Sequence, residues 1–85
     1  MSNGDPSGRP RVRVLSKPGC HLCADAEAIV AVVCADAGAS FEVVDVTADP
    51  ALLAAYGEQI PVTFVDGIQH DFWRVDPARL RAALG

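Results

Sequence analysis

The sequence predicts an α/β fold, in which a four-stranded mixed sheet carries flanking helices in the order βαβαββα. Two observations predict it: segments of strand and helix periodicity alternate along the chain, and an Asp66-Gly67 turn separates the last two strand segments. A helical crossover makes the two strands that it joins parallel, whereas a two-residue turn makes them antiparallel. The sheet is therefore expected to contain both kinds of pairing.

The first half of the chain predicts one strand and one long helix. Residues 11–15 alternate polar and apolar side chains, which is the pattern of a half-buried strand. Residues 23–37 place apolar side chains at helical spacing, and Gly38 is well placed to end that helix. The side chains expected on its buried face are Cys23, Ala26, Val30, Val33, Cys34 and Ala37, flanked by Leu22 and Ile29.

The second half repeats one device for starting a helix. Asp49-Pro50 and Asp76-Pro77 each offer an aspartate as N-cap and a proline at the first helical position, and Gly57 ends the first of these helices. The elements expected here are strands at 41–46, 62–65 and 68–72, and helices at 50–56 and 77–84.

Length and charge limit the classes of function. A chain of 85 residues is one small domain, with residues 1–10 expected to be a disordered tail and residues 11–85 the folded part. The net charge of −4 argues against nucleic acid or an anionic membrane as the main partner. No apolar run is long enough for a membrane span, and the first residues lack the apolar region of a signal peptide. A cytoplasmic location is expected.

The most informative motif is Cys20-His21-Leu22-Cys23, at the start of the long helix. Residues three apart in a helix lie on one side, with Cβ atoms roughly 5–6 Å apart. A disulfide needs Cα atoms about 4.4–6.8 Å apart, so this pair can close and open with small local adjustment. The positive end of the helix dipole favours a thiolate at Cys20. In a reducing compartment, such a motif is either catalytic or metal-binding.

Three further features occur in a fixed order with this motif. The run from Lys17 to Cys23 is followed by Ile60-Pro61 before the third strand, by the Val65-Asp66-Gly67 turn, and by a short terminal helix. In order and spacing, this set resembles the thioredoxin superfamily, and within it the short glutaredoxin-like proteins of bacteria. The resemblance covers residues 11–84 and implies the thioredoxin-like fold.

The resemblance also implies an activity, that of a dithiol thiol-disulfide oxidoreductase acting in cell redox homeostasis. Cys20 is the implied exposed nucleophile and Cys23 the implied buried resolving thiol. The substrates are disulfides of proteins or small molecules. No bound cofactor is implied, and the reductant is a low-molecular-weight thiol, such as glutathione or an equivalent, or a reductase. A monomer is expected.

Four residues are implied in substrate binding. Pro61 is expected in the cis form facing the two cysteines, where the backbone of Ile60 pairs with an extended substrate segment. Lys17 resembles a carboxylate-binding position. Trp73 is either a wall of the substrate groove or a cover for the core beside the last helix. Glutathione-using glutaredoxins carry a Gly-Gly pair near this point, where residues 70–74 are His-Asp-Phe-Trp-Arg, so the identity of the thiol reductant stays open.

Other chemistry-bearing residues have simpler interpretations. Cys34 is three turns beyond Cys23, about 16 Å along the helix, which is too far for a disulfide, and it is expected in the core. Thioredoxins carry a buried acid in the strand before the CxxC, and the only comparably placed acid here is Asp45. It is either a carboxylate that organises a loop or a proton acceptor. His21 and His70 are expected at the surface.

Two alternative functions stay open. A zinc site needs four ligands, and the chain has no second CxxC and no HxxxH, so no metal ligand set is predicted. A cluster shared by two protomers, each lending Cys20, is one alternative, as in the iron–sulfur glutaredoxins that the resemblance includes. The other is a thioredoxin-fold binding module without catalysis.

Overall fold

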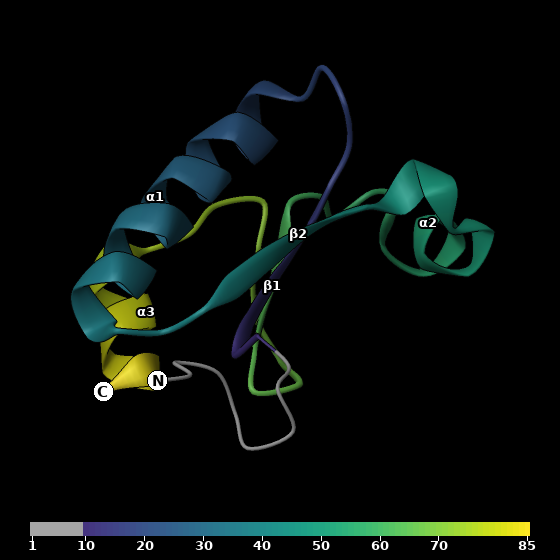
Figure 1. Ribbon diagram of the computed structural model, residues 1–85. Coiled ribbons are helices and arrows are strands. Elements are labelled where there is room, and N and C mark those ends of the chain that lie inside the picture. The colour runs from purple at the N-terminus through teal and green to yellow at the C-terminus, as the bar shows by residue number, and fades with distance from the viewer. Residues whose placement is uncertain (1–9) are drawn as a thin grey trace.

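The computed structural model describes residues 10–85, so the expected disordered tail lies almost entirely outside the described residues. The elements follow the expected order, with one short 3-10 helix added (Figure 1). They are β1 (Val12–Ser16), α1 (His21–Ala37), β2 (Phe41–Asp45), η1 (Val46–Ala48), α2 (Pro50–Tyr56), β3 (Val62–Val65), β4 (Ile68–Phe72) and α3 (Pro77–Leu84). Within residues 10–85, no helix is both long and apolar enough to cross a membrane.

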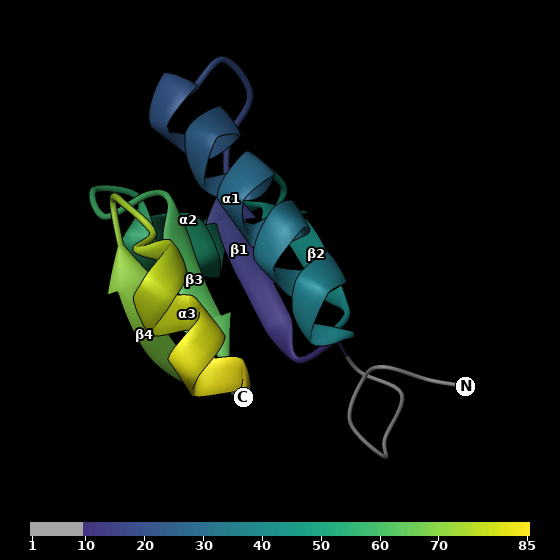
Figure 2. The ribbon, with the colours of Figure 1, turned by 90° about the vertical axis from the view of Figure 1, so that its left-hand side faces the viewer.

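The four strands form one mixed sheet in the order β2-β1-β3-β4. β1 pairs with β2 in parallel and with β3 antiparallel, and β3 pairs with β4 antiparallel. Helices α1 and α3 lie side by side on one face of the sheet, and α2 lies on the other (Figure 2). The predicted mixed sheet with flanking helices is therefore confirmed.

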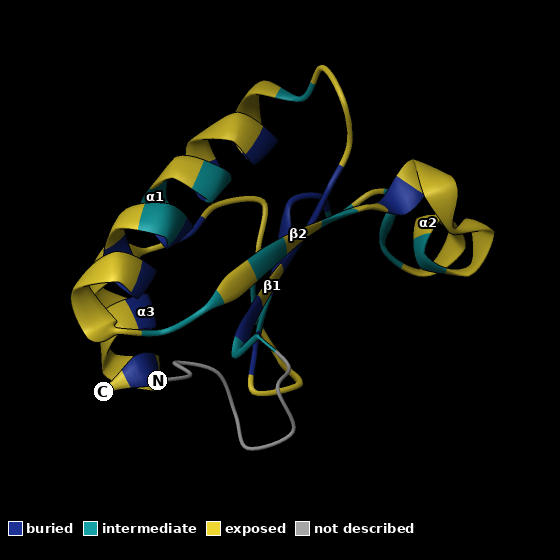
Figure 3. Cartoon of the chain, in the orientation of Figure 1, coloured by how far each residue is buried: buried dark blue, intermediate teal, exposed yellow. Residues whose placement is uncertain are grey.

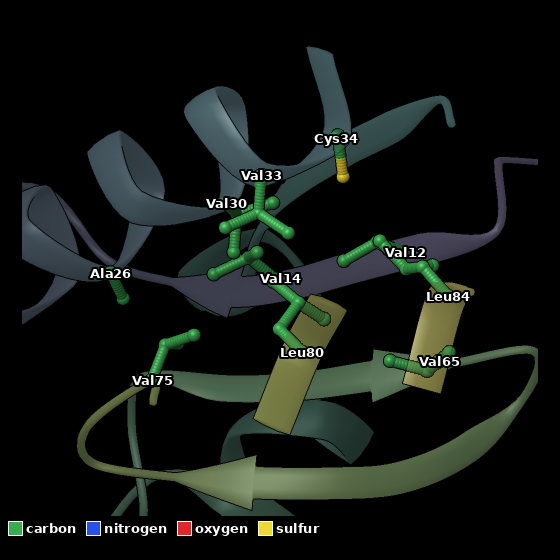
Figure 4. Close-up of a cluster of buried hydrophobic side chains, with 10 residues drawn as sticks. All are labelled: Val12, Val14, Ala26, Val30, Val33, Cys34, Val65, Val75, Leu80 and Leu84. Carbon is green, nitrogen blue, oxygen red and sulfur yellow. The ribbon is translucent and has the colours of Figure 1, made fainter. Parts of the chain in front are cut away.

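The main core fills the space between the sheet and the α1/α3 layer. Because side chains alternate along a strand, Val12 and Val14 of β1 point into this layer and the intervening Arg13 points away. Figure 4 shows the side chains of this cluster, which come from α1, β1, β3 and α3 and the segment before α3. They are Val12, Val14, Ala26, Val30, Val33, Cys34, Val65, Val75, Leu80 and Leu84.

A second buried cluster lies at the end of the sheet where α1 begins. It contains Leu15, Cys23, Val46, Ile60 and Val62. Half-buried side chains from α2 and the neighbouring strands pack against it, although α2 itself buries no residue fully (Figure 3). We call this cluster the buried floor of the cysteine pair, because it includes Cys23 and because Cys20 packs against it.

Two boundary predictions were wrong. Ala37, expected on the buried face of α1, is exposed, because it is the last residue of the helix and the chain turns away at Gly38 with a φ of 68°. Val46, expected in the second strand, starts η1 instead. The Asp45 carboxylate ends the strand by accepting hydrogen bonds from the Thr47 N–H and hydroxyl, at 2.9 Å and 2.6 Å.

Arg11 ties three parts of the fold together at the end of the sheet away from the cysteines. Its guanidinium donates to both carboxylate oxygens of Asp66 in the β3–β4 turn, at 3.0 Å and 2.9 Å, and to the Leu84 carbonyl at 3.1 Å. The hydrogen bond from Arg11 lowers the pKa of Asp66. The folded state therefore gains stability from this pair above the ordinary aspartate pKa of about 4, and loses it as the pH falls through the depressed value.

We expect Arg11→Ala to lower the free energy of unfolding by about 1 kcal/mol at neutral pH, and by less at pH values near 2, where Asp66 is protonated. The effect stays small because 48% of the Asp66 side chain is exposed and water screens the pair. Urea unfolding of both proteins at the two pH values measures it. Arg81→Ala, which breaks only the surface pair with Asp36, is the control. An Arg11→Ala loss that is equal at both pH values would contradict the attribution of this stability to the Arg11–Asp66 pair.

Candidate functional site

Cys20 and Cys23 meet at the N-terminus of α1. The helix begins at His21, so Cys20 is its N-cap, and the Cys20 Sγ accepts a hydrogen bond from the Cys23 N–H at 3.2 Å. Cys20 is partly exposed, whereas Cys23 is 1% exposed and belongs to the buried floor. Both are free thiols. One sulfur is thus reachable from solvent and the other lies one helical turn behind it.

The environment of Cys23 holds it in the protonated form. Burial raises the pKa of the Cys23 thiol, and its hydrogen bond with Cys20 raises it further. Hydrogen bonds from the Ser16 side chain and the Lys17 backbone oppose this rise only in part. If Cys23 is to attack as a thiolate, another group must accept its proton.

The Ile60–Pro61 segment lies next to the cysteine pair. The peptide bond between the two residues is cis, Ile60 is 7% exposed, and Pro61 is fully buried. Ile60 shares the buried floor with Cys23, and Cys20 packs against the same cluster. The fold therefore gathers Cys20, Cys23 and Ile60 at one place, although they are up to 40 residues apart in the sequence.

Trp73 stands in the segment between β4 and α3, with its backbone in the left-handed region at a φ of 64°. Its backbone N–H donates to the Pro61 carbonyl at 2.7 Å, and its indole Nε1 donates to the Glu58 carbonyl at 3.0 Å. Its ring also packs edge to face with Phe72, with centroids 5.1 Å apart. These contacts join Trp73 directly to the cis-proline segment.

The Trp73 side chain does not cover the core. It is 52% exposed and forms one wall of a hollow of about 420 Å³ between α1 and the segment before α3. Opposite it, Leu22 of the CxxC motif, Asp25 and Ile29 line the hollow, and Arg74 lies beside it. The hollow therefore begins at the motif itself.

Lys17 lies on the other side of the cysteine pair. It is exposed in the loop before α1, and it lines a smaller hollow of about 210 Å³ on the side of β2. The residues around that hollow are Ser16, Lys17, Pro18, Glu27, Val43 and Asp45. Lys17 and Trp73, both expected at the substrate site, thus line different hollows that flank the CxxC.

Several other side chains are not part of this site. Asp45 is exposed and bound to Thr47, so it organises the start of η1. Cys34 is 1% exposed in the main core, and burial raises its pKa. His70 lies on the edge strand β4, where a bulge interrupts the β3–β4 pairing, and its side chain is 14% exposed, which is less than the sequence led us to expect. Within residues 10–85, no three His, Cys, Asp or Glu side chains are grouped to hold a metal ion.

One pair of functional candidates was missed in the sequence. Ser16 is 5% exposed, and its hydroxyl donates to the Glu27 Oε2 at 2.8 Å. Sequence patterns place Ser16 in a loop and Glu27 on the helix with no partner. The available signal was that Glu27 follows Cys23 by four residues, which puts both on one face of α1.

A cysteine that caps a helix above a buried thiol, beside an X-Pro at the start of a strand in this mixed sheet, defines the class of thioredoxin-fold proteins. Within that class, residues 11–85 match the glutaredoxin-like domain family (DUF836), and the chain belongs to it. An uncharacterized protein of Mycobacterium tuberculosis is 35% identical over 81 residues, which span 89% of this chain and 84% of that protein.

Solved structures agree with this assignment. The crystal structure of protein XcR50 from X. campestris is 33% identical with a TM-score of 0.71, covering 86% of this chain and 93% of that one. The holo form of glutaredoxin C1 from Populus tremula x tremuloides, at 24% identity and a TM-score of 0.55, covers 88% of this chain and 83% of that one. The similarity to glutaredoxin C1 shows only that the two chains share a fold.

Gly19 directly precedes Cys20, and its backbone conformation sets the direction of the chain at the start of the CxxC motif. Its φ is +76°, which side chains with a Cβ rarely adopt, and no atom lies within 4 Å of the place where a Cβ would be. We expect Gly19→Ala to lower the free energy of unfolding by about 1 kcal/mol through backbone strain alone. Gly19→Asn should lose less, since asparagine tolerates this region better. Urea unfolding of the three proteins checks the order, and an Ala variant as stable as the wild type would refute it.

Proposed function

We propose that this protein is a thiol-disulfide oxidoreductase that reduces disulfides of proteins or small molecules in cell redox homeostasis. One observation carries the proposal. The partly exposed Cys20 Sγ sits at the N-terminus of a 17-residue helix and accepts the Cys23 N–H, with the Cys23 thiol buried directly behind it. An N–H donor and the positive helix end both stabilise negative charge on that sulfur.

The reaction has two steps. The Cys20 thiolate attacks one sulfur of the substrate disulfide, forms a mixed disulfide, and displaces the other substrate sulfur as a thiolate, which takes up a proton. Cys23 then loses its proton and attacks the Cys20 Sγ. This forms the Cys20–Cys23 disulfide and releases the second substrate thiol. Two electrons pass from the protein to the substrate, and an external thiol or a reductase returns them.

Substrate contacts follow from the two hollows that flank the pair. Trp73 and Leu22 offer an apolar wall on one side, where an extended substrate segment also meets the Ile60–Pro61 backbone. Lys17 offers a cation for a carboxylate on the other side. In this proposal the protein works as a monomer in the cytoplasm without a bound cofactor, and its reductant is glutathione or an equivalent small thiol.

The redox equilibrium of the purified protein tests the proposal. Wild type, Cys20→Ser and Cys23→Ser are equilibrated in a series of glutathione buffers, and the thiols are trapped and counted by intact mass. We expect a reversible two-electron transition confined to the Cys20/Cys23 pair in the wild type. A glutathione adduct on Cys23→Ser supports glutathione as reductant. A wild type that shows no reversible transition would refute the proposal.

A further inference from the structure

Trp73 has a backbone conformation that its residue type disfavours. Its φ of 64° lies in the left-handed region, where a bulky side chain is rare and the backbone is strained. The Arg74 N–H donates to the Phe72 carbonyl at 2.7 Å, which closes a tight turn around Trp73. Strain of this kind persists only where neighbouring contacts fix the backbone. The segment that carries Trp73 must therefore be held firmly by the rest of the fold.

Contacts on two sides hold this segment. On the side of the cis-proline segment, Trp73 donates its backbone N–H to Pro61 and its indole N–H to Glu58. On the side of α3, the Arg79 Nη1 donates to the Asp71 Oδ1 at 3.0 Å. Asp71 stands two residues before Trp73, and Arg79 lies in the first turn of α3. This ion pair therefore joins the two ends of the segment between β4 and α3.

A bulge brings His70 to the same carboxylate. On β4, one extra residue stands between the Thr63–Asp71 pair and the Phe64–Gln69 pair, and that residue is His70. Consecutive side chains of a regular strand point to opposite faces. Here, however, the His70 Nε2 lies 4.0 Å from the Asp71 Oδ2, and the two side chains are 14% and 17% exposed. The carboxylate therefore faces the imidazole with one oxygen and the arginine with the other.

The two facing atoms have no hydrogen-bond partner among residues 10–85. The His70 Nε2 and the Asp71 Oδ2 are both buried and unpaired. A buried polar atom without a partner costs free energy, so each of the two gains by meeting the other. Their separation of 4.0 Å exceeds a hydrogen bond by about 1 Å, so a small shift closes it. A protonated imidazole favours closure most, since both of its nitrogens donate and it carries a positive charge.

The charges around His70 also favour closure. On β4 the facing charge is the Asp71 carboxylate, and β3 has no charged side chain. From α3, Arg79 binds the other oxygen of that carboxylate, and 58% of its side chain is exposed, so water screens its charge. The Asp76 carboxylate is occupied in capping α3, and Arg81 pairs with α1. A protonated His70 thus meets one carboxylate and one screened guanidinium.

We propose that Asp71 is a positioning residue for Trp73 and that protonation of His70 tightens its hold, an inference that rests on the proposed oxidoreductase function. Arg79 and His70 hold the carboxylate from two sides. This holds the segment before α3 and keeps the Trp73 ring at the wall of the hollow beside the CxxC. When His70 is neutral, the second contact opens and the ring gains mobility. The device acts on substrate binding and leaves the thiol chemistry unchanged.

A fluorescence titration tests the part of His70. Trp73 is the only tryptophan of the chain, so tryptophan emission reports on this position alone. The protein is titrated from about pH 5 to 8, the range in which histidine changes charge, in a Cys20→Ser background that removes the titration of the exposed thiol. The chain has two histidines, so His21→Gln is the matched control for His70→Gln. We expect a one-proton transition in the parent and in His21→Gln, and its loss in His70→Gln and Asp71→Asn.

Kinetics with both active-site cysteines present test the part of Asp71. The assay is the reduction of insulin with dithiothreitol at neutral pH, over a range of insulin concentrations. We expect Asp71→Asn to raise the KM about threefold or more while kcat changes less than about twofold, since Trp73 contacts the substrate and takes no part in the thiol chemistry. In a Trp73→Gly background, which keeps the backbone N–H and suits a positive φ, Asp71→Asn should change nothing further. A merely structural role predicts a loss in both backgrounds.

The outcomes separate this inference from the function beneath it. An Asp71→Asn protein with the wild-type KM overturns the positioning role and leaves the oxidoreductase intact. A fluorescence transition that persists in His70→Gln, or that disappears in His21→Gln, overturns the part of His70. A wild type without insulin turnover overturns the oxidoreductase function and the substrate role of Trp73 with it. If Asp71→Asn fails to fold, Arg79→Gln breaks the same ion pair from the exposed side and decides the question, with Arg81→Gln as its control on α3.

Discussion

Cys20→Ser is expected to lose turnover by on the order of a thousandfold or more, because a serine hydroxyl is neither ionised at neutral pH nor able to form the mixed disulfide. The measurement is the reduction of insulin disulfides with dithiothreitol as the electron source, corrected for the reaction without protein. The serine hydroxyl can still accept the Cys23 N–H that Cys20 accepts at 3.2 Å, so the helix should keep its cap. The loss of activity should therefore come with little loss of stability.

Two further cysteine variants make this result specific. Cys23→Ser should keep the first step and accumulate a mixed disulfide on Cys20, which intact mass detects as a single adduct. Cys34→Ala should keep turnover, since Cys34 lies in the main core and belongs to no part of the site. Activity that survives in Cys20→Ser but falls in Cys34→Ala would show that the wrong thiol has been taken as the nucleophile.

The order and type of the elements could be read from the sequence because local signals agree there with the tertiary fold. Asp49-Pro50 and Asp76-Pro77 start their helices as predicted, with each aspartate accepting backbone N–H groups of the first turn. Residues 66–67 make the turn between β3 and β4. The CxxC also stands where the strand and helix periods predict it, at the start of α1.

The parts that were missed depend on contacts between distant segments. No periodicity shows that Ser16 meets Glu27, because that contact follows from how the end of β1 packs against α1. The exposure of Trp73 follows from its bonds to Pro61 and Glu58, which hold its backbone in a region that the residue type itself disfavours. Lys17 and Trp73 were assigned to one site, whereas the width of α1 separates the two hollows they line.

Leu80→Ala is expected to give the largest loss of stability, about 3 kcal/mol in the free energy of unfolding. Leu80 is 0% exposed and, with Leu84, is one of the two side chains through which α3 packs into the main core (Figure 4). Its truncation removes apolar contacts and leaves a cavity that a tightly packed layer of valines cannot fill. A domain of this size has about 4–13 kcal/mol in total, so the variant should unfold at a temperature roughly 15 °C lower.

Leu53→Ala is the matched control, the same truncation on a helix of the opposite face. Leu53 is 44% exposed on α2, which buries no residue fully, so its loss should change the free energy of unfolding by less than about 0.5 kcal/mol. Urea unfolding should show the Leu80→Ala midpoint shifted with an unchanged slope, since the surface exposed on unfolding stays nearly the same. Equal losses in the two variants would mean that α3 does not close the core. The layer of α1 and α3 would then not be what fixes the helix that carries the cysteine pair.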